Sequence, residues 1–379
     1  MVPSNKAKRV KLVLSDLHLG DGLFKPTGER NPTENFYFDR ELVELLEFFS
    51  SGKYGEESEV ELILNGDVLD FLSVIYKSHQ FTVVTENISL YKLEQIHQAH
   101  TKVFKAFSKF LELPNHYITY QIGNHDMDFF FEQVREKFKD LVSSDKNRHK
   151  VKFIYKEEFY DVDGKIRIVH GHQYESMHRV NYEKPLLKDA KGREILSLPW
   201  GSLYVMNVIN QHFKKERDYV DKVSPIFLML IYGLITDTFF IIRFMAYTSY
   251  YYIKTKLYYW RFRERAKQTA KKIVGWFNHE FHILGDGESA GQMILKDNPD
   301  LYAVIMGHTH RPKHMTYPSN QMYINTGTWM KMVFFDLDYF GKSLHLPFCL
   351  IEYEEDSDVP KISLFEWKGL QSPFRHFIT

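Results

Sequence analysis

The chain has 379 residues, a length that suits one large domain or two ordinary ones and is ample for a buried core. Its 44% hydrophobic and 26% charged residues exclude wholesale disorder, and its zero formal charge argues against a globally basic nucleic-acid-binding protein. The single cysteine, Cys349, excludes an internal disulfide framework and Cys-rich zinc modules, and it indicates a reducing compartment.

The first residues do not have the pattern of a secretory signal. The positive residues near the start are followed by a short apolar run at 10–14, which ends at the charged Asp16. We therefore expect a cytoplasmic protein, with attachment to the cytoplasmic face of a membrane as the other possibility considered.

Apolar runs and helical spacing alternate along the chain. They predict strands at 10–14, 60–64, 117–122, 166–169, 302–306 and 322–325, and helices at 38–49, 90–113 and 129–141. Strands that alternate with helices indicate an α/β architecture. No internal repeat or low-complexity tract interrupts this pattern.

One segment, residues 175–298, has few strand signals and much helical pattern. We interpret it as a mainly helical insertion, a lid or a membrane-docking element, on a core formed by residues 1–174 and 299–379. The sequence does not indicate an oligomeric state, because an apolar insertion serves a dimer as well as a membrane.

Five predicted strands end in aspartate, histidine or asparagine. In open α/β sheets, ligands bind outside the carboxyl ends of strands, where turns bring distant residues together. Carboxylate and imidazole groups without cysteine suit manganese, iron or zinc. The polar groups at these ends are Asp16, His18, Asp67, Asn124, His125, Asp126, His170, His172, His308 and His310.

These strand ends occur as five blocks in a fixed order. The blocks are Asp16-Leu17-His18, Gly66-Asp67-Val68-Leu69-Asp70, Gly123-Asn124-His125-Asp126, His170-Gly171-His172 and Gly307-His308-Thr309-His310. Together they resemble the motif blocks of calcineurin-like metallophosphoesterases, over most of the chain except the insertion. The resemblance implies a sandwich of two mixed β-sheets flanked by helices.

The resemblance also implies a centre for two divalent metal ions, with Mn²⁺ preferred and iron or zinc as alternatives. One ion would be held by Asp16, His18 and His310. The other would be held by Asn124, His170 and His308, with Asp67 between the two. Such a pair of ions lowers the pKa of a bound water and so supplies a hydroxide that attacks phosphorus.

Two further residues are implied to be catalytic. His125 stands where related enzymes often have a general acid or a contact to the transition state. Asp126 is expected to orient it, since a carboxylate fixes an imidazole tautomer. Asp70, His172 and Arg311 are neighbours whose functional and purely structural interpretations are about equally supported.

Each block alone has a plainer interpretation. Asp67 and Asn124 are ordinary turn residues, and Asp126 is an ordinary helix cap. The plainer interpretations together require five strands to end in ligand-type residues by accident. Five other histidines are expected on helix surfaces: His97, His100, His178, His279 and His282.

The insertion contains an apolar stretch followed by a basic one. Residues 226–236 and 238–242 are almost wholly apolar, but Asp237 and Arg243 argue against a membrane-spanning helix. Residues 254–272 carry eight cations and one acid, with aromatic residues among them. Residues 225–272 therefore predict contact with a membrane surface, the alternative being a basic hairpin that packs on the core or on another subunit.

Within the family, this arrangement resembles UDP-2,3-diacylglucosamine pyrophosphatases, although the insertion is longer and His125 stands where they commonly have arginine. The resemblance implies a phosphohydrolase that cleaves a phosphoester or pyrophosphate bond in a lipid-linked small molecule. The alternatives are a phosphodiesterase or protein phosphatase with a soluble substrate, and a decayed metal-bound scaffold. No nucleic-acid partner is expected.

Overall fold

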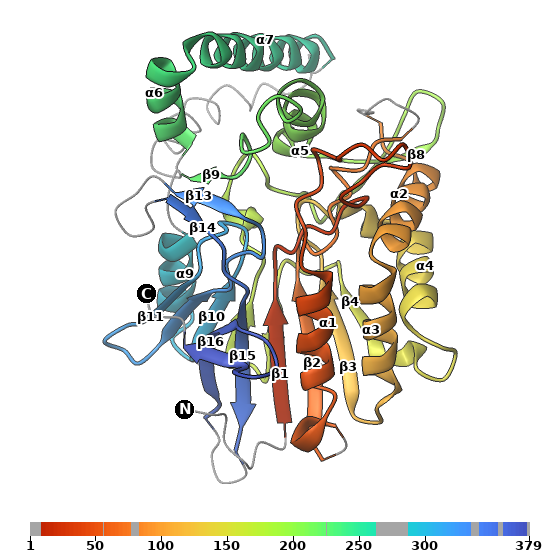
Figure 1. Cartoon of the computed structure of the whole chain (residues 1–379), viewed down its shortest axis with the longest axis vertical. Coiled ribbons are helices and arrows are strands. Elements are labelled where there is room, and N and C mark those ends of the chain that lie inside the picture. The colour runs from red at the N-terminus through yellow and green to blue at the C-terminus, as the bar shows by residue number, and fades with distance from the viewer. Residues whose placement is uncertain are drawn as a thin grey trace.

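Two stacked β-sheets form the centre of the molecule (Figure 1). The computed structural model describes residues 9–55, 57–76, 83–224, 226–262, 287–334, 341–354 and 359–376. Helices cover the outer faces of the two sheets, and further helices gather at one end of the molecule. The predicted α/β sandwich of two mixed sheets is confirmed.

The larger sheet has seven strands. The four strands β1 to β4 pair in parallel, and the last three strands of the chain continue the sheet in antiparallel pairing. In spatial order the strands are β17 (Phe374–His376), β16 (Lys361–Trp367), β15 (Pro347–Tyr353), β1 (Arg9–Leu14), β2 (Glu59–Asn65), β3 (His116–Gln121) and β4 (Val151–Ile154).

The second sheet has five strands, and its central strands β6, β10 and β12 are parallel. In order they are β11 (Lys313–Thr316), β12 (Met322–Asn325), β10 (Ala303–Met306), β6 (Ile166–Ile168) and β5 (Tyr160–Val162). Two small sheets accompany it: β14 (Gly341–Ser343) with β13 (Met332–Phe334) and β9 (Val223–Ser224), and the pair β7 (Leu186–Lys188) with β8 (Glu194–Leu196).

The two large sheets pack face to face. Val13 and Ile63 of the larger sheet pack with Ile168 and Ile305 of the smaller one in a single buried cluster. On β1, the alternate residues Val10, Leu12 and Leu14 turn instead toward the helices. Because successive strand residues face opposite ways, burial on both faces explains why these strands read as continuous apolar runs.

Four helices cover the outer face of the larger sheet, and one covers the smaller sheet. The four are α1 (Asp39–Phe48), α2 (Glu86–Ala99), α3 (Thr101–Glu112) and α4 (Glu132–Val142), and the fifth is α9 (Gly287–Asp297). Short 3₁₀ turns lie at Gly52–Tyr54, Met127–Phe130, Arg148–Lys150 and His172–Tyr174.

The helix predicted at 90–113 is in fact two helices, α2 and α3, which meet at His100. The backbone of His100 is not helical, and its imidazole is only 3% exposed. Its Nδ1 lies 2.8 Å from a carboxylate oxygen of Asp39, and its Nε2 lies 3.6 Å from Glu34. The expectation that His100 lies on a helix surface is therefore wrong, because this buried ion pair draws the side chain inward.

This ion pair predicts a pH-dependent contribution to stability. Burial lowers the pKa of His100, but the hydrogen bonds to Asp39 and Glu34 outweigh it and raise the pKa to about 9, from 6.5. The protonated form therefore stabilises the fold below about pH 6.5, by up to about 3 kcal/mol, and this contribution is lost as the pH rises to about 9.

Urea unfolding of the wild type and of His100→Gln across this range measures the contribution. We expect the difference in free energy of unfolding between the two proteins to be largest at acid pH and to shrink by about pH 9. A difference that does not change with pH would contradict this role for His100.

The segment predicted as an insertion contributes the helices at the upper end of the molecule in Figure 1. These are α5 (Trp200–Tyr204), the π-helix η5 (Val205–Phe213) that continues it, α6 (Ile226–Thr236) and α7 (Thr238–Phe262). The segment also includes α9, which packs on β10 and β12 through Ile294 and Leu295. The domain boundaries at 174 and 299 stay a prediction.

Among the described residues, no helix combines the length and the apolar composition needed to cross a membrane. Of the predicted basic stretch, residues 263–272 lie outside the described residues.

Candidate metal centre

The carboxyl ends of strands from both large sheets meet at one place. Asp16 and His18 follow β1, Asp67 follows β2 and Asn124 follows β3, whereas His170 follows β6 and His308 and His310 follow β10. Backbone hydrogen bonds hold neighbouring loops in register, from Asp16 N to Gly66 O at 3.1 Å and from Gly307 N to His170 O at 2.9 Å. The sandwich therefore brings the five sequence blocks together.

The backbone of this region is strained. Seven non-glycine residues in the described part of the chain have positive φ, and five of them are predicted ligands. Those five are Asp16 (52°), His18 (56°), Asp67 (53°), His308 (66°) and His310 (60°). Left-handed backbone costs free energy for residues other than glycine, and it concentrates at functional sites. The concentration of this strain at five predicted ligands supports a functional site.

Three glycines of the blocks allow the loops to approach closely. A Cβ on Gly123 would lie 2.2 Å from Asp67 Oδ1, one on Gly307 2.4 Å from Asp16 Oδ2, and one on Gly66 2.5 Å from His170 Nδ1. Real Cβ atoms do not approach this closely, so a larger residue would displace a predicted ligand. These close approaches explain why glycine occupies these three positions.

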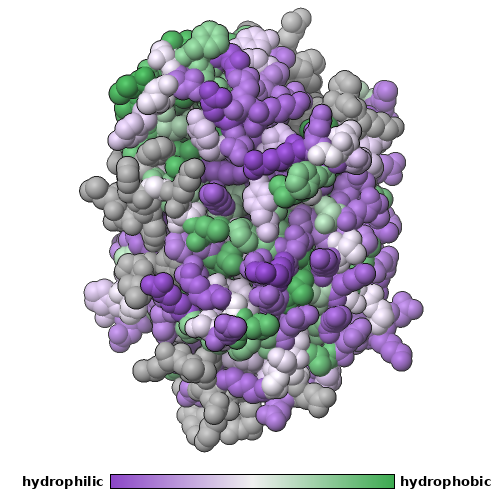
Figure 2. Space-filling view, in the orientation of Figure 1, coloured by the Kyte–Doolittle hydropathy of each residue, from purple (hydrophilic) through white to green (hydrophobic). Residues whose placement is uncertain are grey.

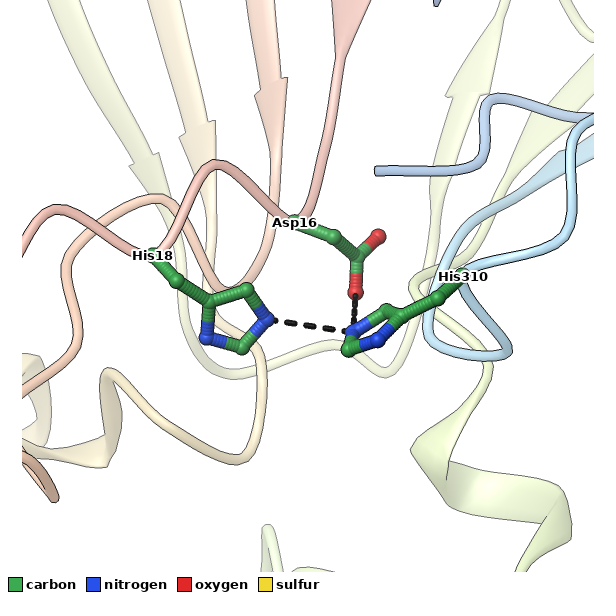
Figure 3. A group of neighbouring side chains, drawn as sticks. All are labelled: Asp16, His18 and His310. Atoms are coloured by element: carbon green, nitrogen blue, oxygen red, sulfur yellow. Dashed lines mark hydrogen bonds and ion pairs between the residues drawn. The ribbon is translucent and has the colours of Figure 1, made fainter. Parts of the chain in front are cut away.

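The first group of side chains consists of Asp16, His18 and His310, which point toward one another (Figure 3). His310 Nε2 lies 3.1 Å from His18 Nε2 and 3.3 Å from Asp16 Oδ1. Two imidazole nitrogens and a carboxylate oxygen thus converge on one point. Such a triad is a typical set of ligands for a divalent transition metal.

The second group consists of Asp67, His170 and His308, whose possible ligand atoms all lie within 4.8 Å of one another. His170 Nδ1 donates to the backbone oxygen of Asn65 at 2.8 Å, so its Nε2 is turned toward Asp67 Oδ2 at 3.3 Å. A hydrogen bond that fixes the tautomer of an imidazole in this way is common in metal ligands. Asp67 also reaches the third block, because its Oδ1 accepts a hydrogen bond from His125 N at 2.8 Å.

Two buried atoms support the fit of a cation to this second group. His170 Nε2 and Asn124 Oδ1 are buried, and neither has a hydrogen-bond partner among the described residues. Buried polar atoms rarely lack a partner, and an ion is one of the partners that explains them. The nitrogen and oxygen donors of the two groups therefore fit divalent ions, as the sequence predicts.

The electrostatics of the site also favour a cation. Burial raises the pKa of Asp67, but the charges of His170 and His125 overcome this and hold the pKa well below its usual value. Conversely, burial lowers the pKa of His170, but the charges of Asp67 and Asp16 raise it to about 10. The buried carboxylates thus stabilise a positive charge at this point, whether it is carried by a proton or by a metal ion.

His125 is oriented by a different carboxylate from the one expected. Its Nδ1 lies 2.9 Å from Asp70 Oδ1, and the other oxygen of Asp70 lies 3.7 Å from His18 Nδ1. Burial lowers the pKa of His125, but the charges of Asp70 and Asp67 outweigh it and raise the pKa to about 9. Asp70, which the sequence left undecided, is therefore the partner of His125.

Asp126 connects two loops instead. Its carboxylate accepts hydrogen bonds from Tyr120 OH at 2.8 Å, from Val68 N at 3.2 Å and from Gly123 N. Burial and the charge of Asp67 raise the pKa of Asp126 to about 7. The expected orienting contact with His125 is not made, because these donors occupy both carboxylate oxygens.

Two residues beside the site were missed by sequence reasoning. Glu175 Oε2 lies 2.6 Å from His308 Nε2, and His178 lies 3.4 Å from the Asn124 amide nitrogen, with its ring stacked edge-on near His308. Burial lowers the pKa of His178 to about 4, so this imidazole is neutral. Their position soon after the fourth block was the only signal in the sequence, and His178 was expected on a helix surface.

Two other neighbours of the blocks lie outside both groups. His172 is fully buried and stacks on Tyr182, and burial beside His170 holds its pKa well below the usual value. Arg311 has its guanidinium 5.7 Å from the centre of the Phe334 ring.

The fold and the site define an α/β sandwich with a candidate centre for two metal ions, and known proteins add little to this. No family model and no curated protein matches the chain. Solved structures that are weakly similar include an uncharacterised protein from Streptococcus pneumoniae described as a predicted phosphoesterase (9% identity, TM-score 0.29, covering 99% of this chain and 98% of that one). A dimetal phosphatase from Danio rerio is 12% identical, with a TM-score of 0.36, over 96% of each chain. Zinc-complexed Vps29 from Entamoeba histolytica is 19% identical, with a TM-score of 0.17, over 24% of this chain and 44% of that one. Likenesses this weak carry no argument about function, which rests on the site itself.

Glu175 gives a prediction that is independent of turnover. The Glu175 carboxylate accepts a hydrogen bond from His308 Nε2. This hydrogen bond fixes the imidazole tautomer in which Nδ1 of His308 is free to bind an ion. We expect Glu175→Gln to weaken Mn²⁺ binding by about 10- to 100-fold, measured by calorimetric titration of metal-stripped protein. Glu366→Gln is the matched control, because Glu366 pairs with His345 at 3.0 Å away from the site. Equal affinities in both variants would contradict the role of Glu175.

Proposed function

We propose that this protein is a metal-dependent phosphohydrolase with a two-metal centre. The observation that carries the proposal is the pair of adjoining side-chain groups, Asp16–His18–His310 and Asp67–His170–His308, assembled from four strand ends. Their strained backbone and the buried atoms without a hydrogen-bond partner among the described residues, His170 Nε2 and Asn124 Oδ1, support the same conclusion.

Each proposed ligand has a place in this arrangement. Asp16, His18 and His310 hold one ion, Asn124, His170 and His308 hold the other, and Asp67 lies between them. Mn²⁺ is the proposed metal, with iron and zinc as alternatives suited to the same donors. When bound, two such ions stabilise the charge on a phosphoryl group and lower the pKa of a bound water.

His125 supplies the proton in this proposal. Its Nδ1 is engaged by Asp70, which leaves Nε2 as the nitrogen that donates to a phosphoryl or leaving-group oxygen. The Asp70 carboxylate stabilises the protonated ring, so that His125 carries a proton before the reaction begins. Asp126 acts indirectly, because it connects the loops that carry Asp67 and His125.

We further propose that the substrate is a lipid-linked phosphoester or pyrophosphate, with UDP-2,3-diacylglucosamine as the first compound to test. Support comes from α5 and η5, which lie against the loops of the site. Ser202 donates to the backbone oxygen of Asn124 at 3.3 Å, and Asn210 donates to that of Leu72 at 3.0 Å. An apolar helical segment thus adjoins the site, where it can contact an acyl chain.

Hydrolysis with added Mn²⁺, beside a chelated control, tests both levels of the proposal. We expect metal-dependent release of UMP from UDP-2,3-diacylglucosamine. Hydrolysis of a generic aryl phosphodiester without UMP release would overturn the lipid-linked substrate and indicate a soluble one. Hydrolysis of neither compound by metal-loaded protein would overturn the phosphohydrolase itself.

A further inference from the structure

The outer surface of α6 and α7 is mainly apolar from residue 226 to residue 257. The side chains at its centre are the most exposed large apolar residues among those the structure describes, Ile235 at 78% and Phe239 at 79%. Figure 2 shows apolar side chains gathered at the upper left of the molecule, where α6 and the start of α7 lie. The exposed apolar residues of the two helices are Ile226, Phe227, Ile231, Tyr232, Leu234, Ile235, Phe239, Ile242, Met245, Tyr250, Ile253 and Leu257.

Five of these residues form a stripe along α7. Phe239, Ile242, Tyr250, Ile253 and Leu257 follow one another at spacings that place them on one side of a helix. The opposite side of the helix is also apolar, but it is covered. There Phe240, Ile241 and Phe244 pack with η5 and α6 in a buried cluster.

A helix at a protein surface normally has a polar outer side. Here both sides are apolar, and only the inner one is covered by described residues. A continuous apolar surface of this kind marks a place of interaction. We name it the hairpin surface, and it consists of the twelve exposed residues given above.

The charges around the hairpin surface indicate the partner. Neither α6 nor α7 contains a carboxylate. Asp237, in the turn between them, is paired with Arg217 at 2.6 Å, and Arg243 is paired with Glu216. Toward the end of α7, Lys254 lies over the ring of Tyr250 and Lys256 over that of Tyr252. Cations and tyrosines beside an apolar stripe are typical of helices that lie in a membrane interface.

We propose that the hairpin surface docks on a bilayer that contains anionic lipids, with α6 and α7 lying in the plane of the interface. A second copy of the chain fits less well, because neither helix has a carboxylate to pair with Lys254 and Lys256 of its partner. The docking does not depend on the proposed function. The hairpin lies at the end of the molecule toward which β1 points, which is also the end that carries the site (Figure 1). From there the docked hairpin would present a lipid-linked substrate to the site, and this role rests on the proposed function.

Flotation of the full chain with lipid vesicles tests the docking directly. We expect the wild type to float with vesicles of phosphatidylcholine and phosphatidylglycerol, and less with phosphatidylcholine alone. The double variant Ile235→Glu/Phe239→Glu should reduce the bound fraction at least about tenfold, because two carboxylates enter the apolar stripe. Leu370→Glu is the matched control, since Leu370 is an exposed leucine, 55% accessible, in the loop before β17.

Each other outcome is decisive. A wild type that stays unbound with anionic vesicles, or a double variant that floats like the wild type, overturns the proposal. Light scattering without lipid tests the alternative partner, a second copy of the chain. If the wild type is a dimer, the double variant is a monomer and vesicle binding is unchanged, the hairpin surface is assigned to a second copy instead. Metal-dependent hydrolysis of a water-soluble phosphodiester, measured without vesicles, should be equal in all three proteins. If none of the three proteins hydrolysed either this phosphodiester or UDP-2,3-diacylglucosamine, the proposed function would be refuted and the docking result would stand.

Discussion

Replacement of Asp67 by asparagine is expected to reduce kcat/KM for a phosphodiester by on the order of 10³-fold in the presence of Mn²⁺. Asp67 is buried at 1% exposure, and its two oxygens reach His125 N and His170 Nε2. Asparagine keeps the shape but removes the charge that the proposed ions require. The loss should appear both in turnover and in the number of ions bound per chain.

Asp161→Asn is the matched control, because Asp161 forms an ion pair with Arg167 on β5 and β6, outside the two groups. We expect its rate and its metal content to equal those of the wild type. If Asp67→Asn kept a rate within about tenfold of wild type and bound two ions, the place of Asp67 between the ions would be refuted. Circular dichroism distinguishes a local loss from unfolding.

His125→Gln is expected to lower kcat by about 10²- to 10³-fold while metal affinity stays unchanged, because His125 is a proton donor and not a ligand in this proposal. Asp70→Asn should cause a smaller loss, since it only orients the ring through the 2.9 Å contact with His125 Nδ1. The double variant should be no slower than His125→Gln alone, because Asp70 would then have nothing to orient.

His97→Gln is the control for this series, since His97 is a partly exposed histidine of α2 near Glu94. Additive losses at Asp70 and His125 would show that Asp70 acts on the reaction independently. A loss of bound metal in His125→Gln would show instead that His125 is a ligand.

The strands that carry the site could be predicted from the sequence because they are buried on both faces. The runs that form β1, β2 and β3 were predicted within one residue of their observed bounds, and each ends in a polar block. Strands β15 and β16 were not predicted. Together with β17 they form the antiparallel part of the larger sheet, so the sequence showed which end of the strands carries the site but not how the sheet is completed.

The partners of the site residues were harder to predict than the residues themselves. Asp126 is adjacent to His125 in sequence, yet its carboxylate turns toward Gly123 N and Tyr120, whereas Asp70 from the preceding block contacts His125. Sequence spacing does not fix which way a side chain points from a turn. For the same reason, His178 was expected on a helix surface and Glu175 was not singled out, although both lie against the site.

The origin of the two proposed ligand groups has a consequence for how the molecule holds together. Asp16 and His18 belong to the larger sheet and His310 to the smaller one, and Asp67 likewise faces His170 and His308 across the same divide. Each bound ion would therefore act as a cross-link between the two sheets at their shared rim. Neither sheet alone carries a full set of ligands, so the ions would be held only while the two sheets are packed together, and separation of the sheets on unfolding would release them.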